Sequence, residues 1–203
     1  MDLPRPSEKQ KLFLRDRHKY VGYGGARGGG KSWAVRVKAV LLCLRYAGIK
    51  VMIVRKTYPE LQENHIVPLC EMLGCYLEGD ERLAVYNDSK KQIAFPNGSR
   101  ILFRYLENER DALRFQGTEV DVLFVDEATA SLDAETSFEV LDAILKLDGY
   151  TRVIVTHDLD ENILRRCTGL FTLKNGAVAE KGTFDNLMEK KGYFYSLFTV
   201  SQR

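Results

Sequence analysis

The glycine-rich segment GARGGGKS at residues 25–32 restricts this chain to a small set of folds. It fits the pattern G-x-x-x-x-G-K-[ST], in which backbone N–H groups surround phosphate oxygens. Glycines are needed because an amide approaches an anion closely only where no Cβ intervenes. Lys31 would neutralise the β- and γ-phosphates, and the Ser32 hydroxyl would bind Mg²⁺. The predicted phosphate-binding residues are Gly25, Ala26, Arg27, Gly28, Gly29, Gly30, Lys31 and Ser32.

The residues around this loop supply the strand–loop–helix context that the pattern requires. Residues 20–23 are typical of a short strand, and residues 32–47 have near-helical apolar spacing that stops at Gly48. Such a helix would point the positive end of its dipole at the phosphates. A flexible glycine linker is the alternative interpretation, and the flanking elements disfavour it.

A pair of carboxylates follows the apolar run at residues 120–125, which is typical of a buried strand. Phosphoryl transfer to water needs a metal ion on the phosphate oxygens and a group that orients the attacking water. Asp126 would hold Mg²⁺, and Glu127 would orient and deprotonate the water. An ordinary acidic loop is the alternative, although few such loops follow an apolar strand directly.

Two further side chains are candidates for the same site. His157 follows a strand-like run at residues 152–156, so in a parallel sheet it should emerge at the same edge as Asp126. It could sense the γ-phosphate, or it could be a structural histidine. Arg114 precedes the acidic strand and is the first candidate for an arginine that a neighbouring subunit offers to the transition state. Arg104 and Arg110 are weaker candidates, and all three could simply lie on the surface.

The overall pattern predicts an α/β fold, a P-loop NTPase of the RecA-like (ASCE) type whose mainly parallel sheet lies between helices. We expect one domain over residues 1–203. An antiparallel hairpin is expected to be inserted around Asn97-Gly98. The other expected elements are helices at 9–14, 59–74, 134–147 and from 184 onward, a strand at 51–54, and a second hairpin around Asn175-Gly176.

Charge and cysteine usage narrow the function classes only a little. Residues 1–60 carry 14 Lys and Arg against 4 Asp and Glu, which would suit nucleic acid, a triphosphate or simply a solvated surface. The four cysteines lack metal-ligand spacing, so we expect buried, reduced thiols. Apolar stretches are too short to cross a membrane, and we therefore expect a cytoplasmic protein without a membrane segment of its own.

Residues 6–125 resemble the ATPase domain of phage terminase large subunits, the motors that drive DNA into capsids. The resemblance includes the segments EKQ at 8–10, YGGARGGGKS at 23–32, VRKTYPEL at 54–61, FPNGS at 95–99 and FQG at 115–117. It implies ATP as the substrate, Gln10 near the adenine and Arg27 as a catalytic arginine inside the loop. It also implies double-stranded DNA and further copies of the chain as partners, and the host cytoplasm as the location.

Residues 126–203 resemble instead the end of an ABC transporter nucleotide-binding domain. The segment SLD at 131–133 resembles its D-loop, VTHD at 155–158 its switch histidine, and KNG at 174–176 with EKGT at 180–183 its closing hairpin. The signature that an ABC partner subunit uses is replaced by LRFQG at 113–117. We also expect no room for the nuclease domain of a terminase.

The chain is therefore interpreted as a mosaic, with a terminase-like part at 1–125 and an ABC-like part at 126–203. Both families are expected to place the phosphate-loop strand beside the acidic strand, so a junction there would be tolerated. Three functions stay open: a terminase-type Mg-ATPase, an ABC-type ATPase subunit, and a recombined or engineered fold that binds nucleotide with little coupled activity.

Overall fold

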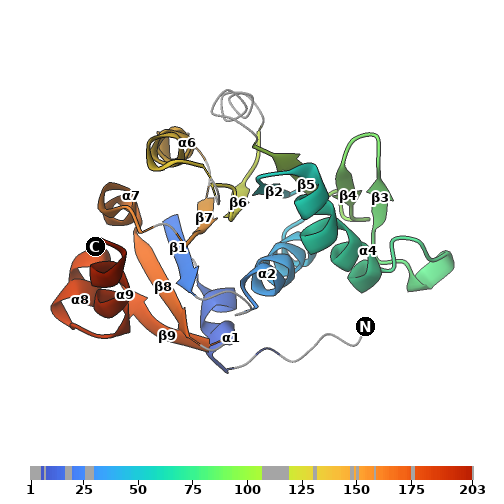
Figure 1. Cartoon of the computed structure of the whole chain (residues 1–203). Helices are drawn as coiled ribbons and strands as arrows, with labels where there is room; N and C mark the ends of the chain where they lie inside the picture. Colours follow the sequence, from blue (N-terminus) through green and yellow to red (C-terminus); the bar gives the residue numbers. More distant parts are fainter. Residues whose placement is uncertain are drawn as a thin grey trace.

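The computed structural model describes residues 6, 8–16, 20–25, 30–106, 119–129, 132–146, 149, 151–157, 159–174 and 177–202. Within these residues one nine-stranded sheet runs through the molecule, with helices on both of its faces (Figure 1). Its strands are β1 (Tyr20–Gly25), β2 (Lys50–Arg55), β3 (Val85–Asn87), β4 (Gln92–Ala94), β5 (Arg100–Tyr105), β6 (Val122–Asp126), β7 (Thr151–Val155), β8 (Gly169–Lys174) and β9 (Ala177–Gly182).

The strand order is β3-β4-β5-β2-β6-β7-β1-β8-β9. The pairs within the central run from β5 to β8 are all parallel, whereas β3/β4, β4/β5 and β8/β9 are antiparallel. The predicted P-loop architecture, with a mainly parallel sheet between helices and an inserted hairpin around Asn97-Gly98, is therefore confirmed.

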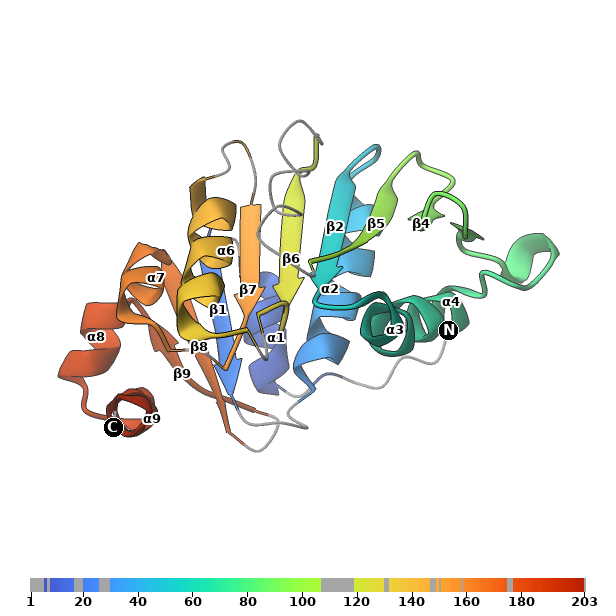
Figure 2. The same cartoon turned by 45° about the horizontal axis from the view of Figure 1, so that its top comes forward.

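One expectation about this sheet is wrong, because β7 lies between the phosphate-loop strand β1 and the acidic strand β6 (Figure 2). The residues Val153, Ile154 and Val155 of β7 are almost fully buried, as a strand covered on both faces requires. After β6 the chain crosses over through α6 (Ala134–Lys146) and returns in this central position. The acidic pair is thus two strand spacings, about 10 Å, from β1.

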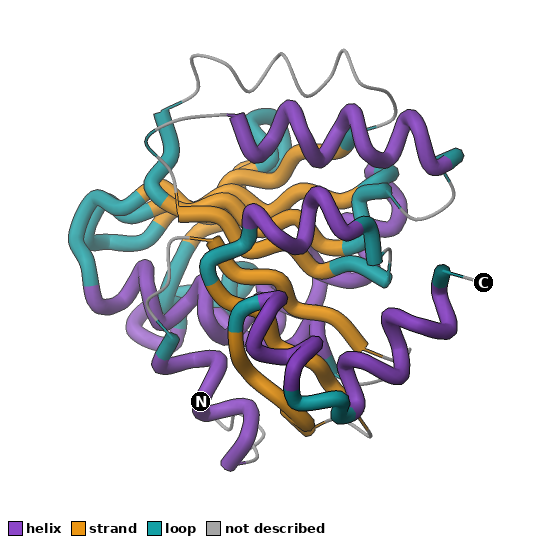
Figure 3. Tube along the Cα trace, turned by 90° about the vertical axis from the view of Figure 1, so that its left-hand side faces the viewer, coloured by secondary structure: helices purple, strands orange, loops and turns teal. Residues whose placement is uncertain are grey.

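Alternate residues of the central strands face two different helical layers, which Figure 3 shows on either side of the sheet. Val51 and Ile53 of β2 pack in one core with helix α2 (Lys31–Arg45), while Met52 and Val54 pack in the other with α6. The remaining helices are α1 (Glu8–Arg15), α3 (Tyr58–Leu61), α4 (Val67–Leu73), α7 (Glu161–Arg166), α8 (Phe184–Glu189), α9 (Tyr193–Ser201) and the 3₁₀ turn η2 (Gly79–Glu81). None of the helices in the described ranges is long and apolar enough to span a bilayer.

The helix expected at residues 59–74 is a continuous helical run from Tyr58 to Leu73 that contains a π turn, η1 (Gln62–Ile66). Thr57 caps its start by accepting a hydrogen bond from Glu60 N, and Gly74 ends it with a left-handed φ of 61°. The π turn joins α3 to α4 and brings His65 into the interior, where its exposed fraction is 0%. The sequence predicted the helix but gave no sign of this turn.

The carboxyl-terminal hairpin β8–β9 and the helices α8 and α9 complete the sheet's far edge. Their apolar side chains form a separate core with α7, which includes Phe184, Leu187, Phe194 and Phe198. The four cysteines are free and buried, as expected.

Candidate active site

Within the described residues, the predicted site residues Lys31, Ser32, Asp126, Glu127 and His157 meet at the carboxyl edge of β6 and β7, where helix α2 begins. Gly30 caps α2 with a left-handed φ of 69°, a conformation that a glycine adopts without strain. Lys31 and Ser32 form the first turn of α2, Asp126 ends β6, and His157 lies two residues after β7. Ser32, at the start of α2, therefore reaches Asp126 at the end of β6, although β7 separates β1 from β6.

Asp126 is the most buried member of the site, with an exposed fraction of 0%. Its Oδ2 accepts hydrogen bonds from Ser32 Oγ at 2.7 Å, from Arg55 NH1 at 2.8 Å and from His65 Nε2 at 2.8 Å. Burial alone would raise the pKa of Asp126, but these hydrogen bonds and the charge of Arg55 hold it below its usual value. The carboxylate is therefore ionised at neutral pH.

Glu127 adopts a left-handed backbone conformation with φ of 52°, which is strained for a residue with a Cβ. Its carboxylate lies 3.5 Å from Lys31 Nζ, 3.3 Å from Arg55 NH2 and 2.8 Å from His157 Nε2. Strain of this kind persists only where the surroundings hold it, and here three cationic or hydrogen-bonding partners hold the side chain. Glu127 therefore closes a charge network with the lysine of the phosphate loop.

His157 Nε2 has two neighbours that demand opposite roles. It lies 3.0 Å from Lys31 Nζ, which can only donate, and 2.8 Å from Glu127 Oε1, which can only accept. With a proton, Nε2 donates to Glu127; without a proton, it accepts from Lys31. The position of the ring proton therefore decides which of the two partners the imidazole binds. The position at the edge of the sheet agrees with the expectation from the sequence.

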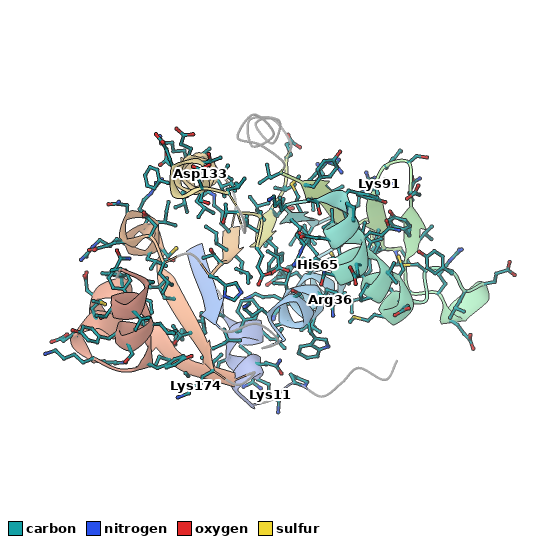
Figure 4. All side chains as sticks on the ribbon, in the orientation of Figure 1. Lys11, Arg36, His65, Lys91, Asp133 and Lys174 are labelled. Carbon is teal, nitrogen blue, oxygen red and sulfur yellow. The ribbon has the colours of Figure 1, made fainter. Side chains whose placement is uncertain are left out.

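Arg55 and His65 contact Asp126 directly, and sequence reasoning missed both. Arg55 ends the apolar strand β2, beside β6, and this strand-end position was a usable signal. His65 comes from the π turn, and nothing in the sequence marks it as a neighbour of the acidic strand. Figure 4 shows His65 close to Arg36 of α2, and Arg36 donates a hydrogen bond to the carbonyl of Asn64.

Gln10 lies on α1, and its side chain approaches the start of α2. A Cβ built on Gly30 would lie 3.2 Å from Gln10 Nε2, so this glycine makes room for the glutamine. The proposed contact of Gln10 with adenine stays a prediction, because it concerns a ligand.

Several predicted residues lie outside the described part of the chain. These are Ala26, Arg27, Gly28 and Gly29 of the phosphate loop and the arginine candidates Arg110 and Arg114. Gly25 ends β1, and Arg104 donates a hydrogen bond from NH1 to the carbonyl of Phe103 at 2.7 Å. The amide cradle and the arginine finger stay predictions.

The residues present fit a magnesium ion. Mg²⁺ prefers oxygen ligands and takes only one or two carboxylates, with phosphate and water completing the shell. Asp126 Oδ1 is buried and has no hydrogen-bond partner within the described residues, and the Ser32 hydroxyl lies beside the same carboxylate. A buried, unpaired carboxylate oxygen is costly unless a ligand uses it.

Comparison with known proteins bears out the sequence resemblance. Residues 23–163 match the family described as terminase large subunit, T4likevirus-type, N-terminal. The chain belongs to this family. The match runs past residue 125 and includes β6, α6 and β7. The part of this match after residue 125 is also the part that resembles an ABC transporter domain in sequence.

Solved structures of both kinds share the fold of this terminase-family chain. A large terminase from a thermophilic bacteriophage has a TM-score of 0.55 at 18% identity, over 75% of this chain and 39% of its own. A bacterial Atm1-family ABC exporter with ATP bound has a TM-score of 0.54 at 16% identity, over 92% of this chain and 38% of its own. These likenesses establish a P-loop ATPase fold.

Curated relatives match a shorter segment of the chain. The multidrug resistance protein sirA of Leptosphaeria maculans is 41% identical over 75 residues, 36% of this chain. The uncharacterised ABC transporter ATP-binding protein YfiC of Bacillus subtilis is 37% identical over 78 residues, 38% of this chain. The chain spans only 6% and 13% of the length of these two relatives. Together with the terminase family match, these similarities agree with a mosaic.

Proposed function

We propose that this chain binds Mg-ATP and hydrolyses it, as a P-loop ATPase of the terminase motor type. The observation that supports this most strongly is the 2.7 Å hydrogen bond between Ser32 of the phosphate loop and Asp126 of the acidic strand. Two side chains separated by 94 residues form one oxygen-lined site, next to a lysine and a second carboxylate. Structural packing alone gives no reason for that set of groups.

The roles follow from the positions of the side chains. Lys31 Nζ would turn from Glu127 to the β- and γ-phosphates, because a triphosphate offers it more negative charge. Mg²⁺, held by Ser32 and Asp126, would neutralise charge on the phosphate oxygens. Glu127, released from Lys31, would orient the attacking water and accept its proton, and His157 would contact the γ-phosphate. Gln10 would lie against the adenine.

Turnover is expected to be slow in the isolated chain and faster when copies assemble. An arginine that reaches the γ-phosphate accelerates such reactions by about 10³–10⁵-fold. Arg27 is the proposed arginine within the chain, and Arg114 is the proposed arginine offered to a neighbouring copy. A homo-oligomer would therefore show a specific activity that rises with protein concentration.

A phosphate-release assay with Mg-ATP tests this proposal. The wild type should hydrolyse ATP, Lys31→Ala should lose ATP binding or turnover, and Glu127→Gln should bind ATP without hydrolysing it. Equal turnover in the wild type and in Glu127→Gln would contradict the role given to Glu127. The absence of nucleotide binding in the wild type would contradict the proposal as a whole.

Double-stranded DNA is the proposed partner of the terminase-type function, supported by the excess of ten positive charges in residues 1–60. Hydrolysis should then rise on addition of DNA at low salt and lose this stimulation as salt increases. An ABC-type ATPase subunit is the second candidate, because the curated relative YfiC, named as an ABC transporter ATP-binding protein, is 37% identical over 38% of this chain. That function predicts a rate that DNA does not change.

A further inference from the structure

We propose that His65 and Arg55 are positioning residues that orient the Asp126 carboxylate, so that Oδ1 is the oxygen presented to a divalent cation. The inference rests on the proposed Mg-ATP site. It gives a function to two side chains that lie outside both the phosphate loop and the acidic strand.

The two oxygens of Asp126 have opposite surroundings. Oδ2 accepts three hydrogen bonds, from Ser32, Arg55 and His65, at 2.7–2.8 Å. An ionised carboxylate offers about two lone-pair sites on each oxygen, so Oδ2 is saturated. Oδ1 is equally buried but has no partner within the described residues. The three donors thus fix the rotamer and leave one oxygen for a ligand.

The donors come from three separate elements, which makes the orientation rigid. Ser32 belongs to α2, and Arg55 ends β2, whose Val54 pairs with Val125 immediately before Asp126. His65 belongs to the π turn η1, where Val67 N donates to the carbonyl of Gln62, five residues earlier. Turns of this kind are frequent at functional sites, because the extra residue redirects a side chain. Here that side chain is the imidazole aimed at Asp126.

A purely structural role explains His65 less well. Its exposed fraction is 0%, and Nδ1 has no hydrogen-bond partner within the described residues. Burying an unpaired polar atom lowers stability, so a leucine of similar size would pack there at less cost. The histidine is accounted for by what Nε2 does, which is to donate to Asp126 at 2.8 Å.

The test measures how much Mg²⁺ tightens nucleotide binding, without relying on hydrolysis. A fluorescent ATP analogue is titrated into the full chain, once with excess Mg²⁺ and once with EDTA, and the ratio of the two dissociation constants is the metal contribution. In His65→Leu this ratio should fall by about 10- to 100-fold, the usual effect of removing a group that orients a metal ligand. The dissociation constant in EDTA should stay at the wild-type value.

Two further variants separate positioning from packing. His65→Gln keeps an N–H donor at the end of the side chain, so it should retain most of the metal contribution. Ile66→Val removes one buried methyl group from the neighbouring position, where the exposed fraction is 2%, and should leave the ratio unchanged. Arg55→Met removes a second donor to Oδ2 and should lower the ratio, which provides a test if His65→Leu does not fold.

The outcomes distinguish this inference from the proposed function. If the wild type binds the analogue with a metal contribution and folded His65→Leu shows the same ratio, the inference is overturned and the proposed function stands. The inference is also overturned if Ile66→Val loses as much of the ratio as His65→Leu, because a general loss of packing would then explain both. A wild type that binds no nucleotide in either buffer would overturn the proposed function together with the inference.

Discussion

The substitution Glu127→Gln should separate nucleotide binding from hydrolysis, because this carboxylate faces the same lysine that the phosphates need. Glu127 Oε1 lies 3.5 Å from Lys31 Nζ. At an effective dielectric constant of about 20, two unit charges at this separation interact by roughly 5 kcal/mol. Solvent screens this interaction and removes much of its energy, because the Glu127 side chain is 22% exposed.

A net gain of about 1.4 kcal/mol on removing this competition corresponds to about tenfold tighter ATP binding. Loss of the carboxylate as a base should lower kcat by about 10²–10⁴-fold. Nucleotide titration gives the first quantity and single-turnover phosphate release gives the second. Glu60→Gln is the matched control, because the Glu60 carboxylate also pairs with Arg55, at 3.5 Å from its Nε, and is half exposed. Wild-type turnover in Glu127→Gln, or weaker ATP binding than in the wild type, would refute this reasoning.

Three further predictions concern single side chains. Lys31→Ala should weaken ATP binding by more than about tenfold, because a hydrogen bond to a charged group contributes about 1.5–3 kcal/mol. Calorimetric titration measures the ATP affinity, and an unchanged affinity would exclude a contact between Lys31 and the phosphates. His157→Ala should slow single-turnover hydrolysis with little effect on ATP affinity, and an unchanged rate would leave His157 a structural residue. Burial lowers the pKa of Lys38 to about 8, so the unfolded chain holds more protons than the folded protein between about pH 8 and 10.5. The free energy of unfolding of the wild type should therefore increase relative to that of Lys38→Met as pH rises across that window, as denaturant titrations of both proteins at several pH values would show; a difference between the two proteins that does not change with pH would contradict the shift.

Much of the fold was predictable because local patterns agree with the final packing. The loop at residues 25–32 set the start of α2, and the apolar run before Asp126 became β6. Asn97-Gly98 correctly predicted an antiparallel hairpin, since Gly98 adopts a φ of 84° that other residues avoid. Each of these features depends on a few residues that are adjacent in the chain.

The order of the strands and the surroundings of Asp126 depend on residues far apart in the chain. A buried parallel strand such as β7 has the same apolar pattern wherever it lies in the sheet, so the pattern alone did not place it between β1 and β6. The contact between His65 and Asp126 joins residues 61 positions apart, through a π turn that local propensities do not encode. Arg55 was the one missed residue with a local signal, its position at the end of an apolar strand.

A crystal structure of the chain with Mg²⁺ and a non-hydrolysable ATP analogue would show directly whether the proposed site holds the nucleotide. We expect the phosphates to lie at the start of α2, with Lys31 Nζ turned from Glu127 to the β- and γ-phosphates. The metal ion should lie between Ser32 Oγ and Asp126 Oδ1. A nucleotide bound elsewhere, or a metal ion that Asp126 does not contact, would contradict the proposed function.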